Sequence, residues 1–341
     1  MNRVRTLIDQ RLRSRLPEGG CFEVSAALAV ATELSDLQYR PGDGRTHEYL
    51  STLATLGLAD ASLARVVEPH LDAHAILRQA GVGPEITAIG ADRGSTWGVY
   101  AAHAPGMGLT AIGDQHGWTL TGTKPWCSLA GQLSHAVITA EVAGRGQQAF
   151  AVRLDPEHVS VVPTRWVSRG LAGIPSGPIE VRELPAVPLG HPGWYVQRPG
   201  FAWGGIGVAA VWYGIALAFR ERMVSRLAER AADPIALAQF GGVDEGMFSA
   251  ATGLDHAAEA IDAGAADPML LAQRVRATVA RVCEHVMLTA GHLLGPGPLV
   301  GEEPYARRVA DLGVYLRQHH GQRDLAHLGE LAAAAAGYDH D

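Results

Sequence analysis

Apolar residues recur at helical spacing in the first part of the chain. Four stretches carry this pattern, and proline or glycine follows each of them: residues 3–16, 22–39, 46–56 and 60–79. We expect Asp60 or Ala61 at the N-cap of the last of these helices and Gly81 at its end. Successive helices with short connections predict an α-helical lobe over residues 1–85.

The pattern changes to short alternating runs in the middle of the chain. Apolar and polar residues alternate over residues 109–112, 118–120, 136–140, 149–154, 159–163 and 179–183. Turn residues separate these runs at intervals of roughly ten, which is typical of an antiparallel barrel or sandwich. We therefore predict a β lobe over residues 86–192.

Long helical patterns return after residue 193. They cover residues 201–231, 244–264, 268–294, 304–320 and 324–336. Long helices joined by short loops predict a helical bundle over residues 193–341. The expected fold is thus α+β, with an N-terminal α-helical lobe, a middle antiparallel β-barrel lobe and a C-terminal helical bundle.

Residues 117–130 form the most informative stretch of the β lobe. Trp118 and Leu120 alternate with threonines, so we expect a strand, a tight turn at Gly122 and a second strand. Trp126 then precedes Ser128 by two residues. An indole beside a hydroxyl can hold a flat ring by stacking and hydrogen bonding, while an ordinary hairpin with a core tryptophan is the structural alternative.

One glycine-rich stretch resembles a dinucleotide-binding fingerprint. Residues 205–210 read Gly-Ile-Gly-Val-Ala-Ala, but no strand precedes them and no strand–helix alternation surrounds them. Small residues recur every three to four positions at Gly204, Gly207, Ala210 and Gly214. We interpret them as a helix face that allows close packing.

Composition narrows the functional classes. The net charge of −7 argues against a nucleic-acid-binding surface as the main function. The three cysteines are far apart and fit a reducing cytosol, so we expect a cytoplasmic protein. The apolar run at 204–219 is too short to span a membrane, and His285 and His292 lack a third metal ligand at suitable spacing. We expect no membrane span and no metal site.

The order of the lobes, with Gly-Trp-x-Leu-x-Gly-x-Lys-x-Trp at 117–126, resembles the acyl-CoA dehydrogenase family over nearly the whole chain. Residues 58–65 resemble the family's helix leading toward the substrate cavity. Residues 304–320 resemble its late helix, which follows a glycine-rich turn, here 294–297.

The resemblance implies FAD between the β lobe and the bundle, and a small-molecule acyl substrate. Trp126, Cys127 and Ser128 match the segment beside the isoalloxazine ring, with Ser128 near the hydride-accepting N5. Arg230 and Gln239 are the nearest match to an arginine and a glutamine that reach a neighbouring subunit's FAD. A homodimer or homotetramer follows by the same analogy.

The sequence departs from the family at the catalytic base. With Asp311 as the family's late-helix aspartate, the position of the usual glutamate falls on His319. The ordinary pKa of histidine suits proton abstraction near neutral pH, although histidine is also favoured at helix C-termini without any catalytic role. The loop before the central strand also differs, because residues 97–106 keep only Pro105-Gly106 of the family's Thr-Glu-Pro-Gly.

The expected function is therefore a FAD-dependent oxidoreductase. It would act on an acyl thioester or a related acyl group by α-proton abstraction, with His319 as the candidate base, and hydride transfer to flavin. Two alternatives remain open: a flavin-dependent monooxygenase on the same fold, and a non-catalytic partner subunit.

Overall fold

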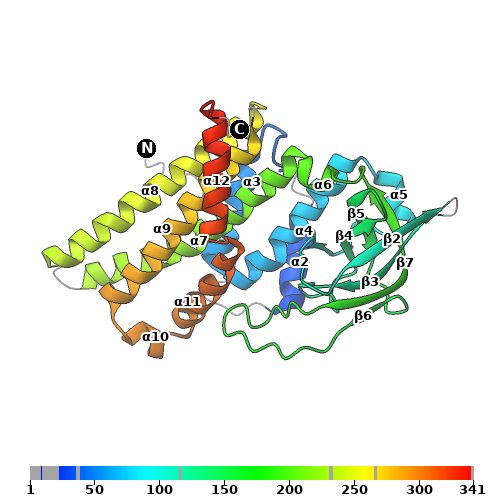
Figure 1. Ribbon diagram of the computed structural model, residues 1–341. Coiled ribbons are helices and arrows are strands. Elements are labelled where there is room, and N and C mark those ends of the chain that lie inside the picture. The colour runs from blue at the N-terminus through cyan, green and yellow to red at the C-terminus, as the bar shows by residue number, and fades with distance from the viewer. Residues whose placement is uncertain are drawn as a thin grey trace.

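A computed structural model describes residues 9, 23–35, 39–114, 117–229, 233–264 and 267–338. It places a helical body beside a β lobe (Figure 1). Except for residue 9, the helix predicted at 3–16 lies outside the described residues. The first helices are α2 (Val24–Ser35), α3 (Thr46–Ala59), α4 (Ala61–Ala80) and α5 (Gly83–Ala88).

The ends of α4 are set by local sequence. The Asp60 side chain accepts a hydrogen bond from the Leu63 amide at 2.9 Å, so this carboxylate caps the first turn. Gly81 ends the helix in the left-handed conformation, with φ of 71°. Both predictions for this helix are confirmed. Because Asp60 is buried, the cap also fixes where α4 enters the core.

The β lobe contains a mixed sheet. Its strands are β1 (Trp97–Tyr100), β2 (Leu109–Asp114), β3 (Gly117–Lys124), β4 (His135–Val142), β5 (Gly146–Arg153), β6 (Val159–Val161) and β7 (Ile179–Leu189). β2, β3, β7, β5 and β4 close into a barrel, because β4 pairs with both β5 and β2. The purely antiparallel prediction is wrong in part, since β4 runs parallel to β1 and to β2.

Gly122 does not turn the chain as predicted. β3 continues through it to Lys124, and the register to β7 shifts between Leu120 and Gly122. Gly122 has φ of 130°, and a Cβ atom there would stand 2.2 Å from the Gly108 carbonyl oxygen. The glycine therefore allows a bulge and a close backbone approach inside one strand, while the segment after Lys124 forms turns instead of a second strand.

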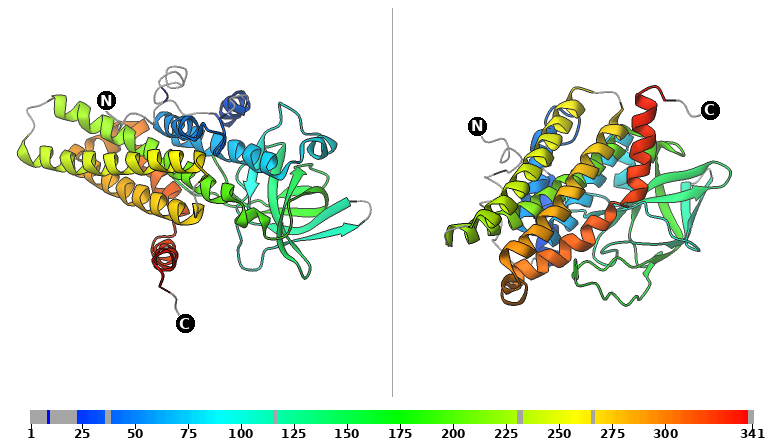
Figure 2. Two further views of the ribbon diagram at one scale, coloured as in Figure 1. Left: turned by 90° about the horizontal axis from the view of Figure 1, so that it is seen from above. Right: turned by 60° about the vertical axis from the view of Figure 1, so that its left-hand side comes forward.

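The remaining helices are α6 (Trp194–Gln197), α7 (Pro199–Glu229), α8 (Pro234–Asp262), α9 (Pro268–Leu294), α10 (Gly297–Gly301), α11 (Glu303–Tyr315) and α12 (Gln322–Ala335). The long helices among them form the bundle, while α6 contacts β5 and α7 beside the β lobe (Figures 1 and 2). The helix predicted over 304–320 is shorter: it ends at Tyr315, and a 3-10 turn over Leu316–Gln318 follows. His319 comes after this turn in an extended conformation.

α7 is the central helix and packs closely on α3. A Cβ atom on Gly214 would lie 1.9 Å from the Ala54 carbonyl oxygen, and one on Gly57 would lie 2.3 Å from that of Val211. The prediction of close packing is confirmed for this face. α7 has the predicted length of 31 residues but begins two residues earlier, at Pro199. Its length and composition are those of a membrane-crossing helix, but 72% of its most apolar window is buried inside the protein. It serves here as a core helix.

The β lobe contacts the helical lobe through α4. The Trp97 amide of β1 donates a hydrogen bond of 3.1 Å to Nδ1 of His70, and the His70 Nε2 lies 2.6 Å from the Ser35 hydroxyl. These bonds join β1, α4 and α2 in a buried contact. The division into domains at residues 85 and 192 stays a prediction.

Candidate functional site

Ser128 lies where the β lobe meets the helical body. It is buried, and its hydroxyl accepts a hydrogen bond of 3.0 Å from an Nη2 amine of Arg65 on α4. The Ser176 hydroxyl, in the loop before β7, lies 2.7 Å from the same oxygen. The Tyr100 hydroxyl of β1 donates to the Ser128 carbonyl at 2.9 Å. Two separate segments therefore hold the Ser128 hydroxyl, and a third holds the backbone of the same residue.

Trp126 lies on the surface, two residues before Ser128 in the chain. Its side chain is 58% exposed, and its backbone adopts a left-handed conformation with φ of 59°. The alternative of a core tryptophan is therefore wrong. A large exposed indole on a strained backbone is a feature that ligand-binding surfaces use.

Cys127 faces the opposite direction. Its Sγ lies 3.4 Å from the Lys124 carbonyl oxygen inside the β lobe, and its amide donates to the Gly177 carbonyl at 2.9 Å. Burial raises the pKa of the Cys127 thiol to about 12, so the group stays protonated and unreactive at neutral pH. Of the three adjacent candidates, the structure places Trp126 outside, Cys127 inside and Ser128 at the junction.

The structure does not bring Gln239 to this junction within one chain. Gln239 lies in the first turns of α8, at the end of the bundle away from the β lobe (Figure 1). α8 packs on α3, α7 and α9. Arg230 lies outside the described residues. Both remain predicted contacts to a neighbouring subunit's cofactor.

His319 sits in the loop between α11 and α12. The Gly321 amide donates to its Nδ1 at 3.3 Å, so the neutral ring carries its proton on Nε2. Nε2 is buried and has no hydrogen-bond partner in the described part of the chain. Burial lowers the pKa of His319, and this favours the neutral ring. In this tautomer the inward nitrogen offers a proton instead of accepting one.

The structure reveals a buried carboxylate that the sequence reasoning missed. Glu68 lies on α4, one turn beyond Arg65, and the Tyr315 hydroxyl approaches its Oε2 at 3.4 Å. Burial raises the pKa of Glu68 to about 7, against the lowering effect of Arg65. Burial also raises the pKa of Asp72, one turn further along. The Glu68 carboxyl group can therefore hold or release a proton near neutral pH.

The spacing of the charged residues along α4 could have identified this polar group from the sequence. Arg65, Glu68 and Asp72 follow one another at intervals of three and four, which places them on the same face of α4. Charged residues on one face of a largely apolar helix are a signal of a polar interior.

Arg276 of α9 completes the polar interior. Its guanidinium lies 4.9 Å from the ring centroid of Trp212 on α7 and donates to the Gly205 carbonyl at 2.9 Å. It also donates to the Gln318 carbonyl at 3.0 Å, directly before His319. Helices α4, α7, α9 and α11 thus contribute charged and aromatic groups to this polar interior.

Comparison with solved structures reveals the fold of the chain. KijD3, in a structure with FMN and dTDP-3-amino-2,3,6-trideoxy-4-keto-3-methyl-D-glucose, matches with a TM-score of 0.79 at 20% identity, covering 100% of this chain and 95% of its own. Glutaryl-CoA dehydrogenase from Mycobacterium smegmatis matches with a TM-score of 0.79 at 17% identity, over 97% and 93% of the two chains. This chain has the acyl-CoA dehydrogenase fold.

A third structure, nitrososynthase from Micromonospora carbonacea var. africana, shares the acyl-CoA dehydrogenase fold with this chain. It matches with a TM-score of 0.73 at 20% identity, over 97% of both chains. No protein-family model matches the sequence, and neither does any curated protein. The predicted resemblance is confirmed for the fold, while identities of 20% or less leave the reaction to be argued from the site.

Proposed function

We propose that this protein is a flavin-dependent oxidoreductase whose flavin ring lies against Trp126 and Ser128. The observation that carries the proposal is the Ser128 hydroxyl, held between Arg65 and Ser176, two residues after an exposed indole. An indole face and a fixed hydroxyl are what a flat heteroaromatic ring needs for stacking and hydrogen bonding. The acyl-CoA dehydrogenase fold supports FAD, whereas KijD3 was solved in complex with FMN.

The residues at the junction would have distinct functions. Bound flavin would supply the electron acceptor for the reaction. Arg65 uses one acceptor position of the Ser128 hydroxyl, so the serine proton remains available to Ser176 or to a ring nitrogen. The positive charge of Arg65 would stabilise negative charge that develops on the ring or on the substrate.

Dehydrogenation of an acyl group is the first candidate reaction. It requires a base over the α carbon and donors on the acyl carbonyl. Glu68, with a pKa of about 7, has the proton affinity that this step needs, and Arg65 and Arg276 could polarise a carbonyl. A small-molecule acyl compound is the substrate under this proposal.

Oxygenation is the second candidate reaction, and His319 favours it. The position expected for the catalytic glutamate holds a neutral imidazole whose inward Nε2 carries a proton. A proton donor at this place suits a monooxygenase, because oxygen insertion does not require removal of an α proton by a carboxylate. A partner subunit without turnover is the third outcome.

An absorption spectrum of the purified protein tests flavin binding. We expect flavin bands as isolated, or saturable binding of FAD or FMN to the apoprotein. Trp126→Ala and Ser128→Ala should each weaken flavin binding, while Tyr338→Ala, which removes an exposed aromatic ring near the C-terminus, should not. A colourless protein that neither flavin stabilises against heat would contradict the proposal.

Two assays on the flavin-loaded protein then separate the reactions. Loss of the oxidised flavin bands under anaerobic conditions with acyl-CoA compounds would support dehydrogenation. Substrate-dependent oxygen uptake by the reduced protein would support oxygenation. If flavin binds but neither reaction occurs with the compounds tested, the partner-subunit alternative gains support.

A further inference from the structure

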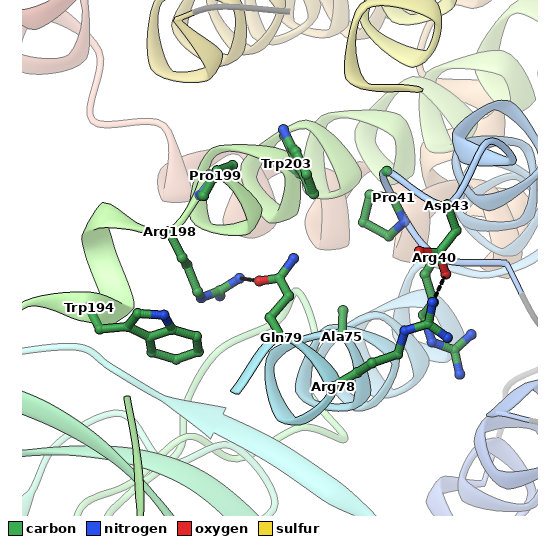
Figure 3. Close-up of a pocket in the computed structure, with 11 residues that line it drawn as sticks. Arg40, Pro41, Asp43, Ala75, Arg78, Gln79, Trp194, Arg198, Pro199 and Trp203 are labelled. Carbon is green, nitrogen blue, oxygen red and sulfur yellow. Dashed lines mark hydrogen bonds and ion pairs between the residues drawn. The ribbon is translucent and has the colours of Figure 1, made fainter. Parts of the chain in front are cut away.

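A recess of about 350 Å³ lies away from Ser128, where the turn over residues 40–43, the end of α4 and the start of α7 meet (Figure 3). Arginine and tryptophan side chains dominate its walls: Arg40, Arg78, Arg198, Trp194 and Trp203. Arg78 follows Arg65 by thirteen positions on α4, which corresponds to about 20 Å along the helix at 1.5 Å per residue. The recess is therefore distinct from the proposed flavin site.

Arg198 provides a buried donor in this recess. The residue is only 6% exposed, and its Nη1 donates to the Gln79 side-chain oxygen at 2.8 Å. Figure 3 shows the guanidinium directed toward Gln79 across the recess. Its Nε is buried and has no hydrogen-bond partner among the residues that the structure describes. An unsatisfied donor on a charged, buried group costs free energy unless a ligand accepts from it.

The charges around Arg198 favour an anion. Arg78 pairs with Asp43, which is the one acidic residue in the wall of the recess. Burial and then the neighbouring charge of Arg78 act together to lower the pKa of Arg40. Asp72 is the next carboxylate near Arg198, and burial raises its pKa. Even with Asp72 included, the described residues around the recess comprise three arginines and only two carboxylates. These are Arg40, Arg78 and Arg198 against Asp43 and Asp72.

The two tryptophans form fixed, partly exposed walls. A Cβ atom on Gly42 would stand 2.8 Å from the Trp203 ring, and one on Gly190 would stand 2.4 Å from the Trp194 ring. Both glycines have positive φ, so the chain approaches each ring as only glycine permits. Indole faces held in this way can stack on a flat ring at little cost in conformational entropy.

We propose that this recess binds a small ligand that carries an oxyanion, a phosphate or a carboxylate, on a flat ring. Arg198 holds the oxyanion through charge-assisted hydrogen bonds, Arg78 adds positive charge to the recess beside its partner Asp43, and Trp194 and Trp203 contact the ring. Cavities of about this volume hold small molecules, and arginine suits both anions because its fork can bind two oxygens at once.

Calorimetric titration of the full chain at low ionic strength tests the proposal. The probes are phenyl phosphate, benzoate and inorganic phosphate. Arg198→Gln, which keeps a donor but loses the charge, should weaken binding of the preferred ring compound ~10-fold or more. Arg78→Gln changes a more exposed arginine and should act in the same direction, so the test survives if the Arg198 variant fails to fold. Arg182→Gln, at a well-exposed arginine of β7, is the control and should bind like the wild type.

The relative affinities of the three probes decide whether the proposal holds. Tighter binding of phenyl phosphate or of benzoate than of inorganic phosphate supports the proposal and identifies the oxyanion. Binding that both recess variants leave unchanged, or that the ring does not strengthen, would overturn it. No heat from any probe up to about 10 mM would overturn it as well, because that concentration lies above the dissociation constant of even weak specific sites. Flavin binding plays no part in this measurement, so its result is independent of the proposed function.

Discussion

Arg65 on α4 donates a hydrogen bond of 3.0 Å to the hydroxyl of Ser128, 63 residues later in the chain. The bond connects the helical lobe to the β-lobe segment that carries Trp126. The position of the serine hydroxyl is therefore set by a helix in a different lobe, and any ligand that uses this hydroxyl depends on both.

Replacing Arg65 should weaken flavin binding. Arg65→Gln removes the charged donor, and we expect the dissociation constant of FAD or FMN to rise by roughly 10-fold, because bonds from charged donors contribute about 1.5–3 kcal/mol. Flavin titration followed by protein fluorescence measures the change. Arg281→Gln on the exposed face of α9 is the control. Equal affinities for the two variants would show that Arg65 does not support the ring.

Glu68 should make stability depend on pH. Its folded pKa of about 7 lies above the ordinary 4.5, so the folded state holds the proton more tightly than the unfolded chain. Its contribution is present at low pH and is lost as pH rises from about 4.5 through 7, and the full shift corresponds to roughly 3 kcal/mol. Urea unfolding should show that the free energy of unfolding decreases more from pH 5 to pH 8 for the wild type than for Glu68→Gln. The exposed Glu157→Gln should follow the wild type, and parallel curves for all three proteins would contradict the burial of this carboxyl.

The buried histidines should make stability depend on pH in the opposite direction to Glu68. Burial lowers the pKa of His70 to about 3 and that of His74 to about 4. Because the unfolded chain binds protons near pH 6.5 and the folded state does not, this contribution to stability decreases as pH falls below 6.5. His70→Gln should be less stable at neutral pH but lose less stability between pH 7 and pH 4. The partly exposed His158→Gln serves as the control for thermal unfolding across this range, and an unchanged slope for His70→Gln would disprove the assignment.

Gly214 should not tolerate a side chain. A methyl group at this position would lie 1.9 Å from the Ala54 carbonyl oxygen, so α3 and α7 would have to separate. We expect Gly214→Ala to lower the free energy of unfolding by about 3 kcal/mol or to prevent folding. Gly253→Ala on α8 meets no atom within 4 Å and should raise stability by about 0.5–1 kcal/mol through helix propensity. Urea unfolding of both variants compares the same substitution in two environments.

The bundle should mediate self-association. Exposed apolar side chains occur along α8, where Ile235 is 73% exposed and Phe248 is 51% exposed. We expect a homodimer or homotetramer by size-exclusion chromatography with light scattering, and Phe248→Glu should shift it toward the monomer. If Gln239 contacts the flavin of a neighbouring subunit, Gln239→Ala should weaken flavin binding in the oligomer. A wild-type monomer at micromolar concentration would contradict both expectations.

Local sequence predicted α4 and α9 well, whereas α8 begins at Pro234, ten residues before the expected start, and α11 ends at Tyr315, five residues before the expected end. α9 begins at Pro268 and ends at Leu294 as expected, and α4 has the predicted cap at Asp60 and end at Gly81. These features depend on hydrogen bonds and φ angles within a few residues, so they can be predicted from the local sequence.

Strand pairing was less accessible to sequence reasoning. β1 has four residues including Gly98, which is too short for an alternating pattern to stand out. Its parallel pairing with β4, like the bulge at Gly122, depends on partners elsewhere in the chain. Sheet register and direction are non-local properties, so the antiparallel prediction was only partly correct.

The sequence by itself determined that an indole and a hydroxyl stand two residues apart, in a chain with helical, β and helical parts. The tertiary structure decided that Trp126 faces outward, that Cys127 is buried, and that Arg65 and Ser176 meet at Ser128. It also gathered Glu68 and Tyr315 from distant helices. Neighbours in sequence fix local geometry, but burial and proton affinity depend on which distant groups exclude water, and only the folded chain sets those.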